Sequence, residues 1–440
     1  MTRSAGKITA IIICCVCSLH AVADDWPQWL GPQRDSVWRE RGVVDTFPAN
    51  GLKVKWRAAI SGGYAGPAVV GDRVYVTDYM CTSGDAFNKP SKRAKLEGSE
   101  RVLCFSAGDG SLIWKHEYEC PYDVSYPAGP RTTPTVSDGK VYTVGTMGDL
   151  RCLDANTGKL LWAKDFKREY GAKTPIWGFS GHPLVDGGKL ICLAGGKDSI
   201  AVAFDKDSGQ ELWHSLSASE TGYCSPVVIH SGAKKQIVIW HADALNGLDP
   251  ETGRPYWSVP LKPSFGMSIA VPRKYGDLLF ASGIGHKCAL LKLDARRPGA
   301  EIVWRGDSRN GVYCANSSPI IENDVIYGVC RQGQLRAVEL ATGRRLWETC
   351  AATTGARPAY YGTAFIVKHE DRYFLFNEHG DLILARLGRE AYEEIGRFHV
   401  LEPTGEAFAR KVVWSHPAFA NRAVYARNDK EMVCVSLAAE

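Results

Sequence analysis

The sequence has 440 residues, of which 45% are hydrophobic and 23% charged, and its formal net charge is +5. This composition is typical of a globular protein, and so small a positive charge argues against nucleic acid as a partner. Beyond residue 23 no run approaches 18 apolar residues, so we predict no transmembrane segment in the mature chain.

Residues 1–23 have the composition of an export signal. A basic start with Arg3 and Lys7 precedes an apolar run over residues 8–19, which is too short to cross a bilayer, and an A-x-A sequence follows at residues 21–23. We expect cleavage after Ala23 and a periplasmic or secreted protein, with an uncleaved anchor as the alternative. The segment contains three of the fourteen cysteines, and the odd number left means that at least one thiol stays unpaired in an oxidising compartment.

Residues 24–52 form the next segment, which opens with "DDWPQWLGPQRDSV". The segment precedes the first regular unit of the chain, and we interpret it as an extended leader that lies against the domain that follows.

A phrase that ends in tryptophan recurs along the rest of the chain. The copies are "CFSAGDGSLIW" ending at Trp114, "CLDANTGKLLW" at Trp162, "AFDKDSGQELW" at Trp213, "GLDPETGRPYW" at Trp257, "KLDARRPGAEIVW" at Trp304 and "AVELATGRRLW" at Trp347. They follow one another at intervals of 43 to 51 residues. This interval is close to the length of one four-stranded propeller blade, roughly 40 to 50 residues.

Each unit has four short β-rich segments and no helical periodicity, which predicts an all-β propeller of four-stranded antiparallel blades. Two weaker copies complete the count, one around Ile395 and one over residues 422–437, where the last copy ends before its fourth strand. The segment "LKVKWRAAI" with Trp56 supplies that strand from the N-terminal side. We therefore predict an eight-bladed propeller over residues 53–440, closed by N- and C-terminal strands in one blade.

The repeated phrase has a structural explanation in each copy. Asp154 can accept hydrogen bonds from the backbone of an Asx turn, Gly158 tolerates the positive φ of a hairpin turn, and Trp162 offers a large flat surface to the neighbouring sheet. We therefore expect the phrase itself to serve packing, and the channel-mouth loops to carry any function.

These residues resemble a known family. The A-x-D-x-x-T-G-x-x-x-W phrase is similar to the repeat of quinoprotein-type β-propellers. The resemblance covers two groups of proteins, namely the alcohol dehydrogenases that depend on pyrroloquinoline quinone (PQQ) and cofactor-free propellers such as the scaffold lipoprotein of the outer-membrane barrel assembly machine. The opening "DDWPQWLGPQRDSV" also resembles the leader of exported members of the family.

The resemblance leaves two functions open. PQQ dehydrogenases place the quinone over a disulfide between adjacent cysteines, hold calcium with a Glu/Asn/Asp set, and use an aspartate as base. The only adjacent cysteines here, Cys14 and Cys15, lie in the export signal. We therefore expect a non-catalytic binding or scaffold propeller without cofactor or metal, whose partner is an envelope or extracellular protein, a peptide or a glycan. The alternative is a PQQ- and calcium-dependent dehydrogenase that oxidises an alcohol or an aldose sugar.

The loops that precede the innermost strand of each blade, here called the inner loops, should converge on one mouth of the central channel. We expect a ligand site there, formed by Tyr64, Arg131, Trp177, His182, Tyr223, Asn316, Tyr361, Trp414 and His416. Aromatic rings and one arginine could stack on and hydrogen-bond a sugar, a quinone or a peptide. The competing interpretation is that these rings only pack between blades. Arg131 is expected to supply the one fixed charge and to contribute little to stability.

Two further features of the sequence stay open. Cys81 and Cys120 could pair in a disulfide, although free thiols are favoured, whereas Cys104, Cys152 and Cys434 occupy a column of small buried residues. The insertion after Cys81 carries Lys89, Lys92, Arg93 and Lys95, and it is either a basic flap or a solvated loop.

Overall fold

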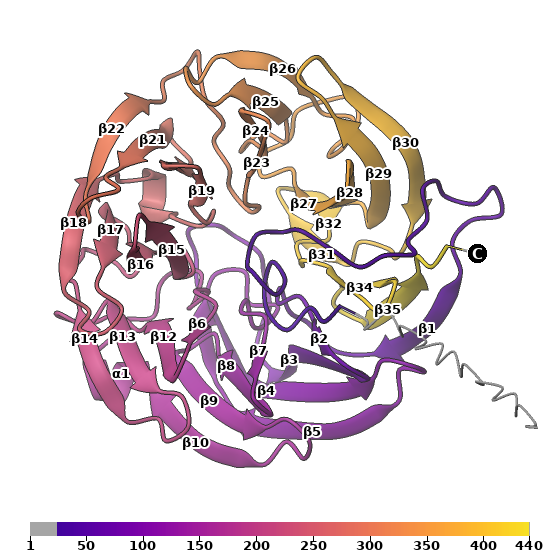
Figure 1. Ribbon diagram of the computed structural model, residues 1–440. Coiled ribbons are helices and arrows are strands. Elements are labelled where there is room, and N and C mark those ends of the chain that lie inside the picture. The colour runs from indigo at the N-terminus through magenta and orange to yellow at the C-terminus, as the bar shows by residue number, and fades with distance from the viewer. Residues whose placement is uncertain (1–23, 440) are drawn as a thin grey trace, which may run out of the picture.

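The computed structural model describes residues 24–439, so the export signal predicted for residues 1–23 lies outside the described part of the chain. Eight four-stranded antiparallel blades form a closed ring around a central channel (Figure 1). The predicted eight-bladed propeller is confirmed. Among the helices described, none is long and apolar enough to cross a membrane.

The first four blades follow one another along the chain. Blade 1 contains β2 (Ala68–Val70), β3 (Arg73–Ser83), β4 (Ala94–Ser106) and β5 (Leu112–Glu119), and blade 2 contains β7 (Thr135–Ser137), β8 (Lys140–Val144), β9 (Asp149–Asp154) and β10 (Leu160–Asp165). Blade 3 contains β11 (Leu184–Asp186), β12 (Lys189–Leu193), β13 (Ala201–Asp205) and β14 (Glu211–Ser215), and blade 4 contains β15 (Val227–Ser231), β16 (Lys234–Trp240), β17 (Ala244–Leu248) and β18 (Pro255–Pro260).

The last four blades complete the ring. Blade 5 contains β19 (Arg273–Tyr275), β20 (Leu278–Gly283), β21 (Lys287–Leu293) and β22 (Ala300–Arg305), and blade 6 contains β23 (Ile320–Glu322), β24 (Val325–Val329), β25 (Leu335–Glu339) and β26 (Arg345–Thr349). Blade 7 contains β27 (Ala364–His369), β28 (Arg372–Asn377), β29 (Asp381–Leu387) and β30 (Tyr392–His399), and blade 8 contains β33 (Ala418–Ala420), β34 (Ala423–Arg427), β35 (Glu431–Ser436) and β1 (Val54–Ala59).

Several short elements lie outside the four-stranded pattern. The strand β6 (Tyr122–Val124) pairs with the extended end of β4, and β31 (Gly405–Ala407) forms a hairpin with β32 (Arg410–Val412) between blades 7 and 8. The helix α1 (Phe166–Tyr170) and the 3-10 turn η1 (Ser264–Gly266) occupy loops. The elements β6, β31 and β32 lie toward the inside of the ring (Figure 1).

The ring closes as predicted through blade 8. Strand β1 pairs antiparallel with β35, and Trp56 lies opposite Cys434. The N-terminal strand therefore covers the edge that β35 would otherwise expose to pairing with other chains.

The recurring tryptophans hold each blade to the next. The indole of Trp114 donates to the carbonyl of Ala155 at 3.1 Å, and its ring lies over Gly158, where a Cβ would approach ring atoms to 2.5 Å. Gly158 has a φ of 71°, and the side chain of Asp154 accepts from the backbone N–H of Thr157 at 2.8 Å. The turn chemistry predicted for the phrase is confirmed, and its glycine also makes room for the tryptophan of the preceding blade.

The column of small residues faces these tryptophans across the sheet. Cys104, Cys152 and Cys434 are buried opposite Trp114, Trp162 and Trp56, as Ala203 and Ala337 are opposite their own tryptophans. This confirms their interpretation as small buried strand residues. All eleven cysteines of the described residues are free thiols, so the alternative pairing of Cys81 with Cys120 is not present.

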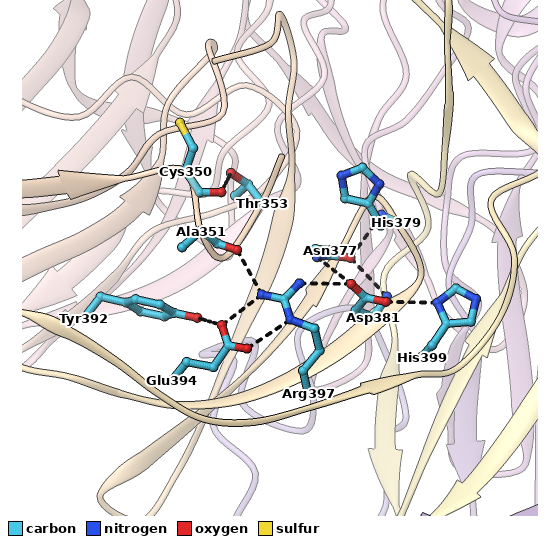
Figure 2. A network of polar contacts seen from close by, with 10 residues as sticks. All are labelled: Cys350, Ala351, Thr353, Asn377, His379, Asp381, Tyr392, Glu394, Arg397 and His399. Carbon is cyan, nitrogen blue, oxygen red and sulfur yellow. Dashed lines mark hydrogen bonds and ion pairs between the residues drawn. The ribbon is translucent and has the colours of Figure 1, made fainter. Parts of the chain in front are cut away.

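Blade 7 has lost the tryptophan, and its outer strand also carries a network of polar contacts with blade 6. Arg397 donates to both carboxylate oxygens of Glu394, to Asp381 at 3.0 Å and to the carbonyl of Ala351, which lies in the loop leaving blade 6 (Figure 2). The hydrogen bonds from Arg397 lower the pKa of Glu394. The network therefore joins blades 6 and 7 on their outer side.

The leader runs into the centre of the ring (Figure 1), where Arg34 donates to carbonyls that precede blades 3 and 4, and it is also bridged to blades 1, 7 and 8. Trp26 forms an antiparallel bridge with Val69 of blade 1, Val37 a parallel bridge with Lys368 of blade 7, and Val43 an antiparallel bridge with Ala438 after blade 8. Trp26, Trp29 and Trp38 of this segment are buried. The leader is thus an integral part of the packed molecule.

Candidate functional site

A cavity of about 190 Å³ lies where the inner loops converge in the central channel. Its lining includes the buried side chains of Trp29 and His182 as well as that of Phe408, which is 40% exposed. All nine residues predicted for the channel mouth line this cavity: Tyr64, Arg131, Trp177, His182, Tyr223, Asn316, Tyr361, Trp414 and His416. The structure therefore brings them together, and their role in ligand binding stays a prediction.

Several lining residues escaped the sequence analysis because they lie outside the repeat. Trp29 comes from the leader, Pro90 from the insertion between β3 and β4, Tyr126 from the loop after β6, and Phe408 from the tip of the β31–β32 hairpin. Alignment of the repeats could not find residues in segments that occur only once. The two tryptophans of "DDWPQWLG" are the one signal that could have suggested a place for the leader in the cavity.

The leader forms the floor of the cavity. The indole of Trp29 stacks on the ring of His182, with centroids 4.4 Å apart and planes 16° from parallel, and its Nε1–H donates to Nε2 of His416 at 3.1 Å. Below it the buried Arg34 donates to the carbonyls of Pro183 and Pro226, which precede the innermost strands of blades 3 and 4. These contacts close the channel on the leader side.

The two histidines are neutral and have fixed tautomers. Burial lowers the pKa of His416 to about 3 and that of His182 well below its usual value, because desolvation disfavours the charged ring. The backbone N–H of Thr133 donates to Nδ1 of His182 at 2.8 Å, and an N–H can only donate, so the remaining proton of His182 is on Nε2. For the same reason Nε2 of His416 accepts from Trp29, and the proton of His416 is on Nδ1.

Aromatic side chains form the walls in pairs. Tyr361 stacks on Phe408 with centroids 5.1 Å apart, Tyr126 lies 5.8 Å from Trp414, and Trp177 lies 5.6 Å from Tyr223. The rings of a pair come from different inner loops or from an inner loop and the β31–β32 hairpin. The walls therefore present several flat apolar faces to the same space.

Arg131 corrects one expectation from the sequence. Its guanidinium donates to the backbone carbonyls of Trp177 at 2.7 Å, Ser125 at 3.0 Å and Tyr126 at 2.6 Å, and also to that of Gly129. Burial lowers the pKa of the group. Arg131 ties its own loop, between β6 and β7, to the loop of Trp177, so it is a structural residue rather than a free charge, and its loss would leave buried carbonyls without partners.

Three aromatic residues of the wall have backbone angles that side chains rarely adopt. Tyr126, Tyr361 and Phe408 have φ values of 53°, 59° and 50°, in the left-handed region that favours glycine. Each such residue costs about 1 to 3 kcal/mol and persists only where the surrounding structure imposes it. Such strain gathers at ligand-binding sites more often than elsewhere.

The insertion lies beside the mouth and is held there by hydrogen bonds. Trp177 donates from Nε1 to the carbonyl of Pro90 at 3.1 Å, Ser125 donates to the carbonyl of Lys89, and Arg93 donates to the carbonyl of Thr174 at 2.8 Å. The insertion is therefore an ordered flap and not only a solvated loop. Of its basic residues, Arg93 serves to fix it.

The ring and its repeat define the class of protein, an eight-bladed propeller with quinoprotein-type repeats. The chain belongs to the family described as outer membrane protein assembly factor BamB, whose sequence profile matches residues 98–349, 197–390 and 241–440.

The curated relatives are distant and are matched over part of their length. The outer membrane protein assembly factor BamB of Shewanella oneidensis is 23% identical over 225 residues, which is 49% of this chain and 56% of that protein. The quinohemoprotein alcohol dehydrogenase ADH-IIG of Pseudomonas putida is 30% identical over 122 residues, which is 26% of this chain and 16% of that protein. The chain thus spans little more than half the length of the BamB relative.

Solved structures share the fold. BamB from Moraxella catarrhalis superposes with a TM-score of 0.52 at 16% identity, covering 81% of this chain and 97% of that one. Quinohemoprotein alcohol dehydrogenase from Comamonas testosteroni superposes with a TM-score of 0.58 at 14% identity, covering 94% of this chain and 81% of that one. At these identities the likeness concerns the propeller alone.

The dehydrogenase relatives raise the question of whether the cavity fits PQQ and calcium. Calcium prefers carboxylate and carbonyl oxygens, and PQQ is an anionic quinone that needs cationic donors. Among the described residues that line the cavity there is no aspartate, glutamate or lysine, and Arg131 already donates to four carbonyls. Nor do three His, Cys, Asp or Glu side chains gather anywhere in residues 24–439 in a way that could hold a metal. The donor set does not fit the cofactor.

Proposed function

We propose that this chain is a non-catalytic binding propeller of the cell envelope, which holds a partner protein, peptide or glycan in the cavity at the channel mouth. The observation that carries the proposal is the wall itself, a cavity of about 190 Å³ in which aromatic rings from several inner loops and from the β31–β32 hairpin face one space.

The setting of the proposal comes from the family and from the sequence. Relatives are named as outer membrane protein assembly factors, and the sequence predicts an export signal over residues 1–23. A scaffold needs a rigid frame with loops that differ from blade to blade, and a propeller with a shaped mouth supplies both.

The runner-up function, a PQQ-dependent dehydrogenase, is tested directly. Purified protein incubated with PQQ and calcium is expected to bind no chromophore and to show no dye reduction with alcohols or aldose sugars, because the cavity offers neither carboxylate ligands nor a free cation. Absorbance after gel filtration measures bound PQQ, and a dye-reduction assay measures dehydrogenase activity. Alcohol-dependent reduction that requires added quinone would establish the dehydrogenase instead.

A capture experiment tests the binding role. Wild-type protein is used as bait for envelope extract beside two variants, Tyr361→Ala at the mouth and Leu161→Ala with Leu212→Ala on the outer strands β10 and β14. Leu161 and Leu212 are 44% and 48% exposed, so their truncation alters a side surface without touching the cavity. We expect Tyr361→Ala to lose the partner and the outer-strand variant to keep it. The reverse pattern would place the partner on the rim and contradict the proposal.

A further inference from the structure

Three polar atoms of the cavity wall have no hydrogen-bond partner among the described residues. They are the hydroxyls of Tyr126 and Tyr223 and the indole Nε1–H of Trp414, and all three atoms are buried. Tyr126 is 8% and Tyr223 4% exposed. A buried donor without a partner costs roughly 1 to 3 kcal/mol, so three in one cavity suggest that something else supplies their acceptors.

The floor adds two further donors. The fixed tautomers leave an N–H on Nε2 of His182 and on Nδ1 of His416, and neither donates to another group in the part of the chain that the structure describes. Both rings line the cavity. Acceptors are scarcer, because Asn316 donates from Nδ2 to Thr363 and presents only its Oδ1. The lining is therefore aromatic, its one charged group, Arg131, is already paired with carbonyls, and its free donors outnumber its acceptors, because the indole and imidazole N–H groups can only donate while the tyrosine hydroxyls can do both.

We infer that the cavity holds a proline-containing segment of a partner polypeptide, an assignment that rests on the binding function proposed above. Proline residues present carbonyl acceptors but no backbone N–H, so they match a wall of donors without adding donors of their own. Their flat rings stack on tyrosine and tryptophan, and proline-rich segments are already extended, which lowers the entropy lost on binding. Proline also carries no charge for the cavity to neutralise.

Aromatic walls could also bind a neutral glycan. The balance of hydrogen-bond donors and acceptors favours a glycan less than a proline-containing segment. Each sugar hydroxyl donates as well as accepts, and its proton needs an acceptor that this cavity offers mainly at Asn316 and at hydroxyl groups. One binding experiment therefore compares a proline peptide with a neutral oligosaccharide.

The experiment follows the fluorescence of the full mature chain, since Trp29, Trp177 and Trp414 line the cavity. The protein is titrated with a capped oligoproline of about six residues, with a capped glycine-alanine peptide of the same length, and with a neutral malto-oligosaccharide. We expect saturable binding of oligoproline alone. Binding of the oligosaccharide without oligoproline would overturn the inference in favour of a glycan. If no probe binds while Tyr361→Ala still abolishes partner capture, the inference fails and the binding function stands.

Two tyrosine variants separate ligand contact from structure. Tyr126→Phe removes only a hydroxyl without a partner, so the melting temperature should stay the same or rise, whereas oligoproline affinity should fall about 5- to 10-fold, the usual effect of one hydrogen bond. Tyr75→Phe is the matched control, because the hydroxyl of Tyr75 donates to the carbonyl of Ala155 between blades 1 and 2. It should lower the melting temperature and leave affinity unchanged. Unchanged affinity in Tyr126→Phe would show that its hydroxyl binds water only and would contradict the inference.

Discussion

Removal of residues 24–60 is expected to abolish recovery of a soluble, folded monomer. The truncation deletes the leader and all of β1, so blade 8 keeps three strands and β35 becomes an exposed edge. It also removes Trp26, Trp29 and Trp38, each at most 4% exposed. The loss of these buried side chains lowers the stability further, but the unpaired edge of β35 is what this truncation adds, and we expect it to lead to aggregation.

A second truncation, which removes residues 24–50 only, separates the leader from the closing strand. It retains β1 and the pairing of Trp56 with Cys434, so the ring can still close while the floor of the cavity is lost. We expect soluble protein with a lowered melting temperature, measured by differential scanning fluorimetry. If the truncation of residues 24–60 instead folds with the melting temperature of the full mature chain, closure through β1 contributes nothing to stability. The interpretation of blade 8 would then be wrong.

Mild acid is expected to destabilise the protein long before its carboxylates protonate. The folded-state pKa values of His182 and His416 lie far below the value of about 6.5 for an exposed histidine. Below about pH 6.5 the unfolded chain therefore binds protons that the folded chain does not, so stability is full above this pH and falls as the pH falls. Each histidine contributes about 1.4 kcal/mol per pH unit, and the pair removes on the order of 4 kcal/mol by about pH 5.

Urea unfolding between about pH 7 and pH 5 measures this loss, and a double variant identifies its source. In His182→Asn the amide oxygen can accept from Thr133 in place of Nδ1, and in His416→Gln it can accept from Trp29 in place of Nε2. Neither replacement can be protonated in this range, so the double variant should lose clearly less stability across it than the wild type, and the loss that remains is expected from His116 and His241, whose pKa values burial also lowers. A slope as steep as that of the wild type in the double variant would show that other groups carry the acid sensitivity.

Most of the fold could be predicted because the repeat encodes it locally. The spacing between Trp114, Trp162 and their equivalents equals the length of one blade, so each interval predicts one blade. The turn residues Asp154 and Gly158 predict the hairpin that precedes the last strand of a blade. The weak seventh copy was placed correctly by counting, although its sequence does not reveal the contacts of Arg397 with Asp381 and with the loop that leaves blade 6. Segments that occur only once, such as β6 and the β31–β32 hairpin, could not be predicted because no repeated sequence pattern marks them.

The cavity could be predicted in part for the same reason. Residues at equivalent points of the inner loops, such as Tyr64 and Tyr361, must converge in a ring, so aligning the repeats found them. The course of the leader across the channel depends on Trp29 meeting His182 and Arg34 meeting two carbonyls, which are long-range contacts that no local pattern carries. The role of Arg131 was misjudged because its partners are backbone carbonyls, which look alike at every position of a sequence.

The closure of blade 8 also constrains the order in which the molecule can form. Strand β1 is near the start of the chain and its partner β35 is near the end, so β1 has no strand to pair with until almost the whole chain has been made. The leader cannot complete its contacts earlier either, because two of its three β-bridges are to Lys368 of blade 7 and to Ala438 after blade 8. Pairings between distant segments slow folding, and the waiting chain exposes strand edges and apolar side chains to aggregation. The ring therefore cannot be completed blade by blade during synthesis, and its native state is reached only after the last strand has been released.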